Sequence, residues 1–194
     1  SLIKKVKNLP VPILPTMVGA FTLSNIYSGM GYTWVRHITA WAAIAVILSY
    51  ILKICFHFDT VKKEYSNTIP ASLYAGFTML TMILGSYFYN ASPVFGKTLW
   101  FVGLILHAIQ ILVFTYNNVI KNFNMQTFLP SWFVTYNGIM VSTVVGGVMN
   151  EPLIGKIVVY YGIAVFTVII PFMIYRLAKH EIKDPVYHTQ AILL

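Results

Sequence analysis

Six apolar stretches, joined by short polar segments, constrain this chain more than any other feature of its sequence. An α-helix needs roughly 20 apolar residues to cross the hydrocarbon core of a bilayer. A transmembrane β-barrel would instead show segments of about ten residues with alternating polarity, and the sequence shows none. We therefore predict an all-α integral membrane protein with one transmembrane domain over residues 1–194. The predicted helices are 11–28, 37–56, 70–89, 98–120, 129–149 and 156–177.

The composition excludes a soluble domain. Hydrophobic residues make up 58% of the 194 residues and charged residues 9%, which is too apolar for a soluble chain of this size. The net charge is +8, but the basic residues lie at the ends of the apolar stretches. We therefore interpret them as a topology signal and predict no nucleic-acid partner. Cys55 is the only cysteine, so no disulfide framework within the chain is expected.

Lysine and arginine are distributed unequally between the two sides of the membrane that the predicted helices would cross. Arg36, Lys97 and Lys156 fall opposite the N-terminus, and the other ten of the 13 basic residues fall on its side. Because cytoplasmic loops carry an excess of Lys and Arg, we predict a multi-pass protein of the cytoplasmic (inner) membrane with a cytoplasmic N-terminus. The final residues, HTQAILL at 188–194, open another apolar stretch. We expect them to start a seventh helix and the native chain to be longer.

The odd and even helices differ in their content of Gly, Pro, Ser, Thr and Asn. Of these types, the stretch 37–56 contains only Thr39 and Ser49, whereas the first, third and fifth stretches are rich in them. Backbone groups freed by Pro or Gly are tolerated in a membrane where protein or a water-filled cavity can satisfy them. We therefore expect helical hairpins in which the odd helices form an inner layer around a pore and the even helices an outer layer.

Small or hydroxylated residues recur at spacings of three and four in the odd helices, which places them on one face of each helix. The predicted pore-lining residues are Pro15, Gly19, Thr22, Thr78, Thr81, Gly85, Thr135, Gly138, Ser142 and Gly146. Alternatively, small residues let neighbouring helices approach closely, as at many helix interfaces in membranes. That alternative is the stronger interpretation of any single residue, so the pore interpretation depends on the shared pattern.

The charges indicate what such a pore would carry. No Asp or Glu lies inside any of the six stretches, whereas cation pathways and proton relays use buried carboxylates or rings of carbonyl groups. Hydroxyl and backbone N–H donors, with basic residues at both mouths, favour anions. We predict a channel or channel-like transporter for small anions such as chloride, nitrate, sulfite or C4-dicarboxylates. A proton-coupled carrier of dicarboxylates or sulfite is the alternative.

No motif in the sequence indicates catalysis or cofactor binding. The sequence contains no P-loop, CxxC pair or metal-ligand spacing. His107 is the one histidine near the middle of a predicted helix, and a lone histidine is more often a hydrogen-bonded packing residue than a ligand. We predict no enzyme activity and no cofactor, and a membrane anchor that binds haem or quinone is the remaining alternative.

Four segments carry a resemblance to a known family. They are LPVPILPTMVGAFTLSN at 9–25, FDTVKKEYSNTIPASLYAGFTMLTMILGSYF at 58–88, NMQTFLPSWFVTYNGIMVSTVVGG at 124–147 and YRLAKHEIKDPVYHTQAILL at 175–194. In this order and spacing they resemble the tellurite-resistance/dicarboxylate transporter family. That family includes the bacterial tellurite-resistance membrane protein, the yeast malate and sulfite transporters and the plant slow anion channels.

The resemblance implies an architecture for the whole family member. Ten helices would form five hairpins with quasi-fivefold symmetry, and kinked odd helices would line a central pore, commonly in a homotrimer. This chain would supply three hairpins and the start of a fourth. The resemblance also implies a pore-occluding phenylalanine on the ninth helix, and no position of this sequence matches it.

Overall fold

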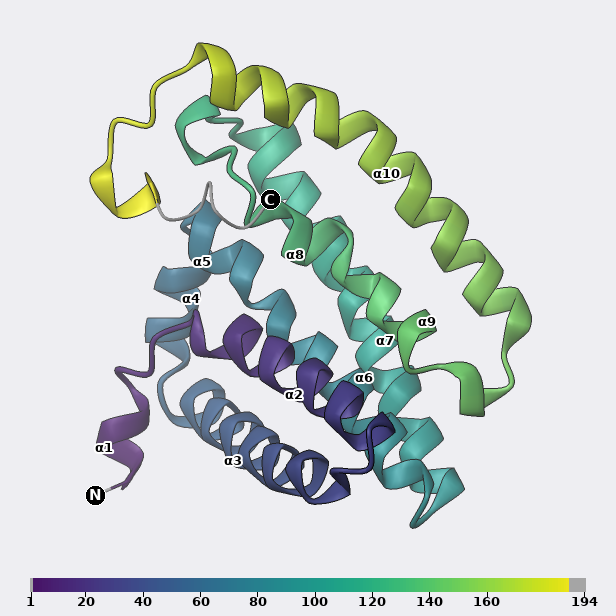
Figure 1. Cartoon of the computed structure of the whole chain (residues 1–194). Helices are drawn as coiled ribbons and strands as arrows, with labels where there is room; N and C mark the ends of the chain where they lie inside the picture. Colours follow the sequence, from purple (N-terminus) through teal and green to yellow (C-terminus); the bar gives the residue numbers. More distant parts are fainter. Residues whose placement is uncertain (1, 189–194) are drawn as a thin grey trace.

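The structure is a computed structural model, and it describes residues 2–188 (Figure 1). These residues form helices joined by turns and loops, without a β-strand. The prediction of an all-α chain is confirmed. The expected seventh helix at 188–194 lies outside the described residues, apart from His188.

The first hairpin pairs two helices that run in opposite directions. A short helix, α1 (Leu2–Val6), precedes α2 (Ile13–Gly29), which is followed by α3 (Thr33–Phe56). Gly31 makes the turn between α2 and α3 with φ at 100°. Glycine adopts this conformation at little cost because it lacks a Cβ atom.

The second hairpin begins with two short helices. These are α4 (Phe58–Tyr65) and α5 (Thr68–Leu73), and only Tyr74 separates α5 from α6 (Ala75–Tyr89). The predicted helix 70–89 is therefore interrupted near its start.

The returning helix of this hairpin, α7 (Pro93–Thr115), ends in a π-helical turn, η1 (Tyr116–Lys121). The hydroxyl of Ser92 accepts a hydrogen bond from the N–H of Phe95 at 3.4 Å and so caps the start of α7. Proline suits the first position of a helix, where an N–H would have no helical partner.

The fifth predicted helix, 129–149, is broken into short pieces. After η2 (Met125–Thr127) come α8 (Trp132–Tyr136), η3 (Gly138–Met140), α9 (Val141–Val144) and η4 (Gly147–Met149). The long helix α10 (Pro152–Lys179) then completes the third hairpin (Figure 1).

The composition of the fifth segment explains its breaks. Glycine loses more backbone entropy in a helix than other residues, and hydroxyl side chains compete for backbone carbonyls. The Thr143 hydroxyl donates to the carbonyl oxygen of Met140 at 2.7 Å. Asn150, with φ at 54°, adopts the left-handed conformation at the turn into α10.

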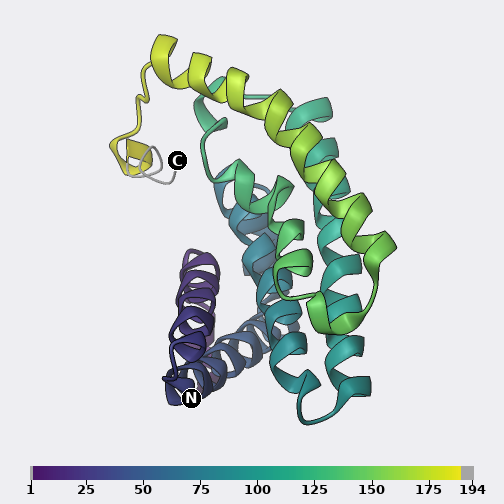
Figure 2. The ribbon, with the colours of Figure 1, turned by 45° about the vertical axis from the view of Figure 1, so that its right-hand side comes forward.

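Helix α6 lies inside the bundle and contacts α2, α3, α7 and α9 (Figure 2). Within the described residues, four helical segments are long and apolar enough to cross a membrane: Thr33–Phe56, Thr68–Tyr89, Pro93–Lys121 and Pro152–Lys179. We compared burial over an 18-residue apolar stretch of each segment. In Thr68–Tyr89, 72% of that stretch is buried, against 22% in Thr33–Phe56, 33% in Pro93–Lys121 and 17% in Pro152–Lys179. The third predicted helix is therefore an inner helix, and the second, fourth and sixth form the outer layer of the described bundle.

A buried ion pair joins helices on the N-terminal side of the bundle. Lys53 of α3 is fully buried, and its Nζ lies 2.8 Å from Oε1 of Glu64 in α4 and 2.8 Å from the carbonyl oxygen of Leu9. The Tyr74 hydroxyl donates to the same carboxylate. These contacts join α3, α4, the α5–α6 junction and the segment that precedes α2.

Candidate functional site

A polar cavity of about 400 Å³ lies at the end of the bundle opposite the N-terminal side, and we call it the distal cavity. It is lined by Asn25, Ser28, Arg36, Ser86, Val144, Val145, Gly147 and Val148. The last turns of α2 and α6 and the α9–η4 region each contribute to it, so the first, third and fifth segments meet here. Arg36 enters from the first turn of α3.

Arg36 is the charged residue of the distal cavity. Its guanidinium carbon lies 5.3 Å from the centroid of the Tyr87 ring, a cation–π distance, and the Tyr87 hydroxyl is 2.6 Å from Nδ1 of His37. Among the described residues, Nε of Arg36 and Oδ1 of Asn25 are shielded from solvent without a hydrogen-bond partner. Because an unsatisfied buried donor costs free energy, a ligand that accepts a hydrogen bond from Arg36 would stabilise this arrangement.

The chemistry of the distal cavity favours an anion. Its lining combines the positive charge of Arg36 with the hydroxyl groups of Ser28 and Ser86, which can donate hydrogen bonds. No carboxylate is among the residues that line it in the described chain. A cation entering the cavity would meet a like charge and no acidic partner.

A second polar cluster joins three segments inside the bundle. His107 of α7 is fully buried; its Nδ1 lies 2.6 Å from the Thr78 hydroxyl and its Nε2 lies 2.7 Å from the carbonyl oxygen of Thr135. A carbonyl oxygen only accepts, so Nε2 donates to Thr135, while Nδ1 contacts the Thr78 hydroxyl, which also donates to the carbonyl oxygen of Ala75 at 2.8 Å. Both ring nitrogens are engaged, and neither is left to bind a haem iron.

Gln110 extends this cluster toward the N-terminal side. Its Nε2 donates to the carbonyl oxygen of Ala71 at 2.7 Å, and its Oε1 accepts from the hydroxyl of Tyr65. Burial raises the pKa of Tyr65 to about 12, so this hydroxyl keeps its proton at neutral pH. Thr135 also donates to the carbonyl oxygen of Ser72 at 2.8 Å.

Three of the predicted pore residues, Pro15, Gly19 and Thr22, lie on α2. Gly19 and Thr22 are exposed and Pro15 is half-buried. A Cβ atom added at Gly19 would meet no atom of the described chain within 4 Å. This face of α2 is therefore open.

Four other predicted residues lie between the third or fifth segment and α7. Thr78 and Thr135 belong to the His107 cluster. A Cβ atom on Gly85 would lie 2.7 Å from the backbone nitrogen of Trp100, and one on Gly138 would lie 2.7 Å from Cε1 of His107. Close helix packing accounts for the small side chains at these four positions.

The last three predicted residues are Thr81, Ser142 and Gly146. Ser142 and Gly146 line a second cavity, of about 300 Å³, beside Trp100, whose Nε1 donates to the carbonyl oxygen of Ser142 at 3.0 Å. The Thr81 hydroxyl donates to the carbonyl oxygen of Phe77. The structure does not bring the ten residues to one common surface, and their role as pore lining stays a prediction.

A comparison with protein families decides the class of this protein. The sequence profile of the SLAC1 family, the voltage-dependent anion channels, matches residues 16–194. The chain belongs to this family. The match confirms the resemblance seen in the four sequence segments, and it assigns the chain to a family of anion channels and transporters rather than of enzymes. A comparison with curated protein sequences gave no match.

For a SLAC1-family protein, the distal cavity adds functional candidates that the sequence did not single out. Arg36 entered the prediction only as a charge outside the membrane, and Asn25, Ser28 and Ser86 only as part of the polar content of the odd helices. One signal was present: Arg36 is separated by three residues from Ala40, which lies in the buried face of α3. An arginine one turn from a buried position can reach the interior of a bundle.

Proposed function

We propose that this chain forms part of a pathway for small anions across the cytoplasmic membrane, with its N-terminus in the cytoplasm. Membership of the SLAC1 family supports anion passage. The observation that carries the proposal is the distal cavity, where three odd segments meet around one cationic side chain and no carboxylate of the described chain. The proposed substrates are chloride, nitrate, sulfite or C4-dicarboxylates, and the proposed assembly is a homotrimer.

In this mechanism the distal cavity concentrates anions at one mouth of the pathway. The guanidinium group of Arg36 raises the local anion concentration. The hydroxyl groups of the cavity replace part of the hydration shell of the entering anion. The open face of α2, with Pro15, Gly19 and Thr22, continues the proposed pathway toward the N-terminal side. Passage then depends on anion dehydration and on pore width rather than on tight binding at one site.

The test is the anion conductance of Arg36→Gln compared with that of the unmodified protein in lipid bilayers. We expect the conductance at low salt to fall several-fold, and the difference to shrink in concentrated salt because ions screen the lost charge. Lys156→Gln is the matched control, since it removes a charge on the same side without altering the distal cavity. A conductance that Arg36→Gln leaves unchanged at low salt would contradict the proposal, as would a reversal potential that follows the proton gradient.

A further inference from the structure

A second polar cavity, of about 680 Å³, lies on the N-terminal side of the bundle, and we call it the proximal cavity. Helix α3 leads from the distal cavity, at Arg36, to the proximal cavity, which begins at Phe58 just after the end of α3. Its walls come from α4, the start of α5 and the π-helical turn η1. A cavity of this size can hold an organic molecule. The polar residues that could bind one are Lys62, Thr68, Asn117, Asn118, Lys121 and Asn122.

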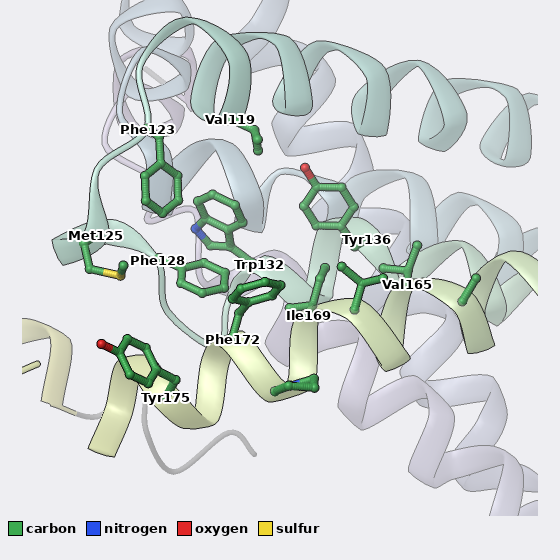
Figure 3. A pocket seen from close by; sticks show the side chains of 13 residues that line it. Val119, Phe123, Met125, Phe128, Trp132, Tyr136, Val165, Ile169, Phe172 and Tyr175 are labelled. Carbon is green, nitrogen blue, oxygen red and sulfur yellow. The ribbon is translucent and has the colours of Figure 1, made fainter. Parts of the chain in front are cut away.

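The π-helical turn η1 contributes to two cavities of opposite chemistry. Val119 lines an apolar groove whose wall includes Trp132 and Tyr136 (Figure 3). Asn117 and Lys121, four residues apart in the same turn, line the proximal cavity instead. Turns of this kind are rare and occur frequently at functional sites. Here η1 presents amide and ammonium groups to a single cavity.

The buried part of the proximal cavity is held by hydrogen bonds within the protein. The hydroxyl of Thr68 donates to Oδ1 of Asn118 at 2.7 Å, and Nδ2 of Asn118 donates to the carbonyl oxygen of Phe114 at 3.1 Å. Asn118 is buried. These bonds join the start of α5 to η1, so two walls of the cavity are fixed to each other before a ligand binds.

The remaining polar side chains of the lining are free to bind a ligand. Within residues 2–188, the side chains of Lys62 and Lys121 form no hydrogen bond or ion pair, and neither do those of Asn117 and Asn122. Ammonium groups donate hydrogen bonds, and an amide group both donates and accepts them. The cavity therefore combines a fixed interior with unused donors.

The two lysines carry positive charge that no carboxylate of the cavity balances. No Asp or Glu is among the described residues that line it. Asp59, three residues before Lys62 in α4, lies outside the lining and forms no ion pair within the described chain. Glu64 is engaged by Lys53. A ligand with two negative charges would therefore neutralise both lysines.

We propose that the proximal cavity binds a phosphomonoester, either free in solution or as the headgroup of a lipid. A phosphomonoester carries a charge of about −1.5 to −2 at neutral pH and three strong acceptor oxygens, which match two ammonium groups and the neighbouring amides. Lysine is a common ligand of phosphate. Phe58 and Val61 supply apolar surface for the organic part of the ligand. This inference does not depend on the proposed anion pathway.

Binding of glycerol 3-phosphate and of phosphatidic acid to the purified protein tests the proposal, because both carry a phosphomonoester. Isothermal titration calorimetry measures the first, and native mass spectrometry compares the second with phosphatidylglycerol, whose phosphodiester has a single charge. We expect phosphatidic acid to remain bound under conditions that remove phosphatidylglycerol. Binding of glycerol 3-phosphate as well would identify a soluble ligand, whereas retention of phosphatidic acid alone would identify a lipid headgroup. Both results support the site, and binding of neither compound would overturn it.

The double substitution Lys62→Gln with Lys121→Gln should weaken phosphomonoester binding on the order of tenfold or more, because charge-assisted hydrogen bonds are the stronger ones. Both lysines are exposed, so this variant should fold. Lys63→Gln with Lys179→Gln is the matched control, since it removes two exposed lysines from the same side and leaves the lining intact. The control should bind as the unmodified protein does.

Two results would contradict the assignment. Equal losses in the two double variants would show that binding follows net charge rather than the cavity. Binding of malate, a dicarboxylate, as tightly as the phosphomonoester would show that the site does not recognise phosphate.

Discussion

Glycines set the distance between α6 and α7. A Cβ atom on Gly85 would lie 2.7 Å from the carbonyl oxygen of Gly96, and one on Gly103 would lie 2.9 Å from the carbonyl oxygen of Thr78. Both contacts are with backbone atoms, which cannot turn aside as a flexible side chain can. In a membrane, such close approach replaces part of the hydrophobic driving force that water would supply.

Gly85→Ala should therefore destabilise the protein by about 1–3 kcal/mol, because the added methyl group forces the two helices apart. The measurement is the free energy of unfolding in mixed micelles. Gly155→Ala in α10 is the control: its Cβ atom would meet no atom within 4 Å, so the change should be neutral or stabilise by up to about 1 kcal/mol. Equal effects of the two substitutions would show that Gly85 does not limit the helix distance.

The two ion pairs of the described chain should differ in their contribution to stability. Lys53→Met leaves the Glu64 carboxylate without its cation and should cost on the order of 2–3 kcal/mol, since Lys53 is fully buried and Glu64 only 25% exposed. Lys97→Met breaks a pair in which both side chains are about one third exposed and should cost less than about 1 kcal/mol. The same unfolding measurement compares them, and a larger loss for Lys97→Met would refute this ranking.

Among the elements, the fifth segment differs most from its neighbours. Its short turns from Gly138 to Met149 contrast with the unbroken helix α6 beside it. Local unfolding concentrates where regular backbone hydrogen bonds are few. The fifth segment is therefore the most easily opened part of the inner layer.

Hydrogen exchange followed by mass spectrometry should detect this difference. Amides between residues 138 and 149 should exchange on the order of tenfold or more faster than those of α6, because local opening there costs less free energy. Helix α10, which is continuous, provides the comparison for an outer element. Exchange in the fifth segment as slow as in α6 would contradict this expectation.

The apolar stretches predicted the helices α3, α7 and α10 because a long run of apolar residues has few alternatives in a bilayer. The breaks in the fifth segment were not predictable, since the same glycines and hydroxyls fit a kinked helix or several short ones. Thr78 and Gly138 illustrate a second limit. A small residue can face water or a neighbouring helix, and only the position of His107 shows which contact these two make.

In the whole molecule, the arrangement of layers carries the functional argument. The second, fourth and sixth segments expose most of their apolar surface, whereas α6 is largely buried. The distal cavity opens where the odd segments converge. We propose that water reaches the protein along these odd segments and not along the even ones.

Cysteine accessibility tests this claim most directly. In a Cys55→Ser background, single cysteines at Ser28 and Ser86 should react with a charged, membrane-impermeant thiol reagent, because the reactive thiolate forms only in water. Cysteines at Ile105 of α7 and Ile163 of α10, both exposed on the outer layer, should remain unreacted in lipid. Rapid reaction at Ile105 and Ile163 together with protection at Ser28 and Ser86 would contradict the account.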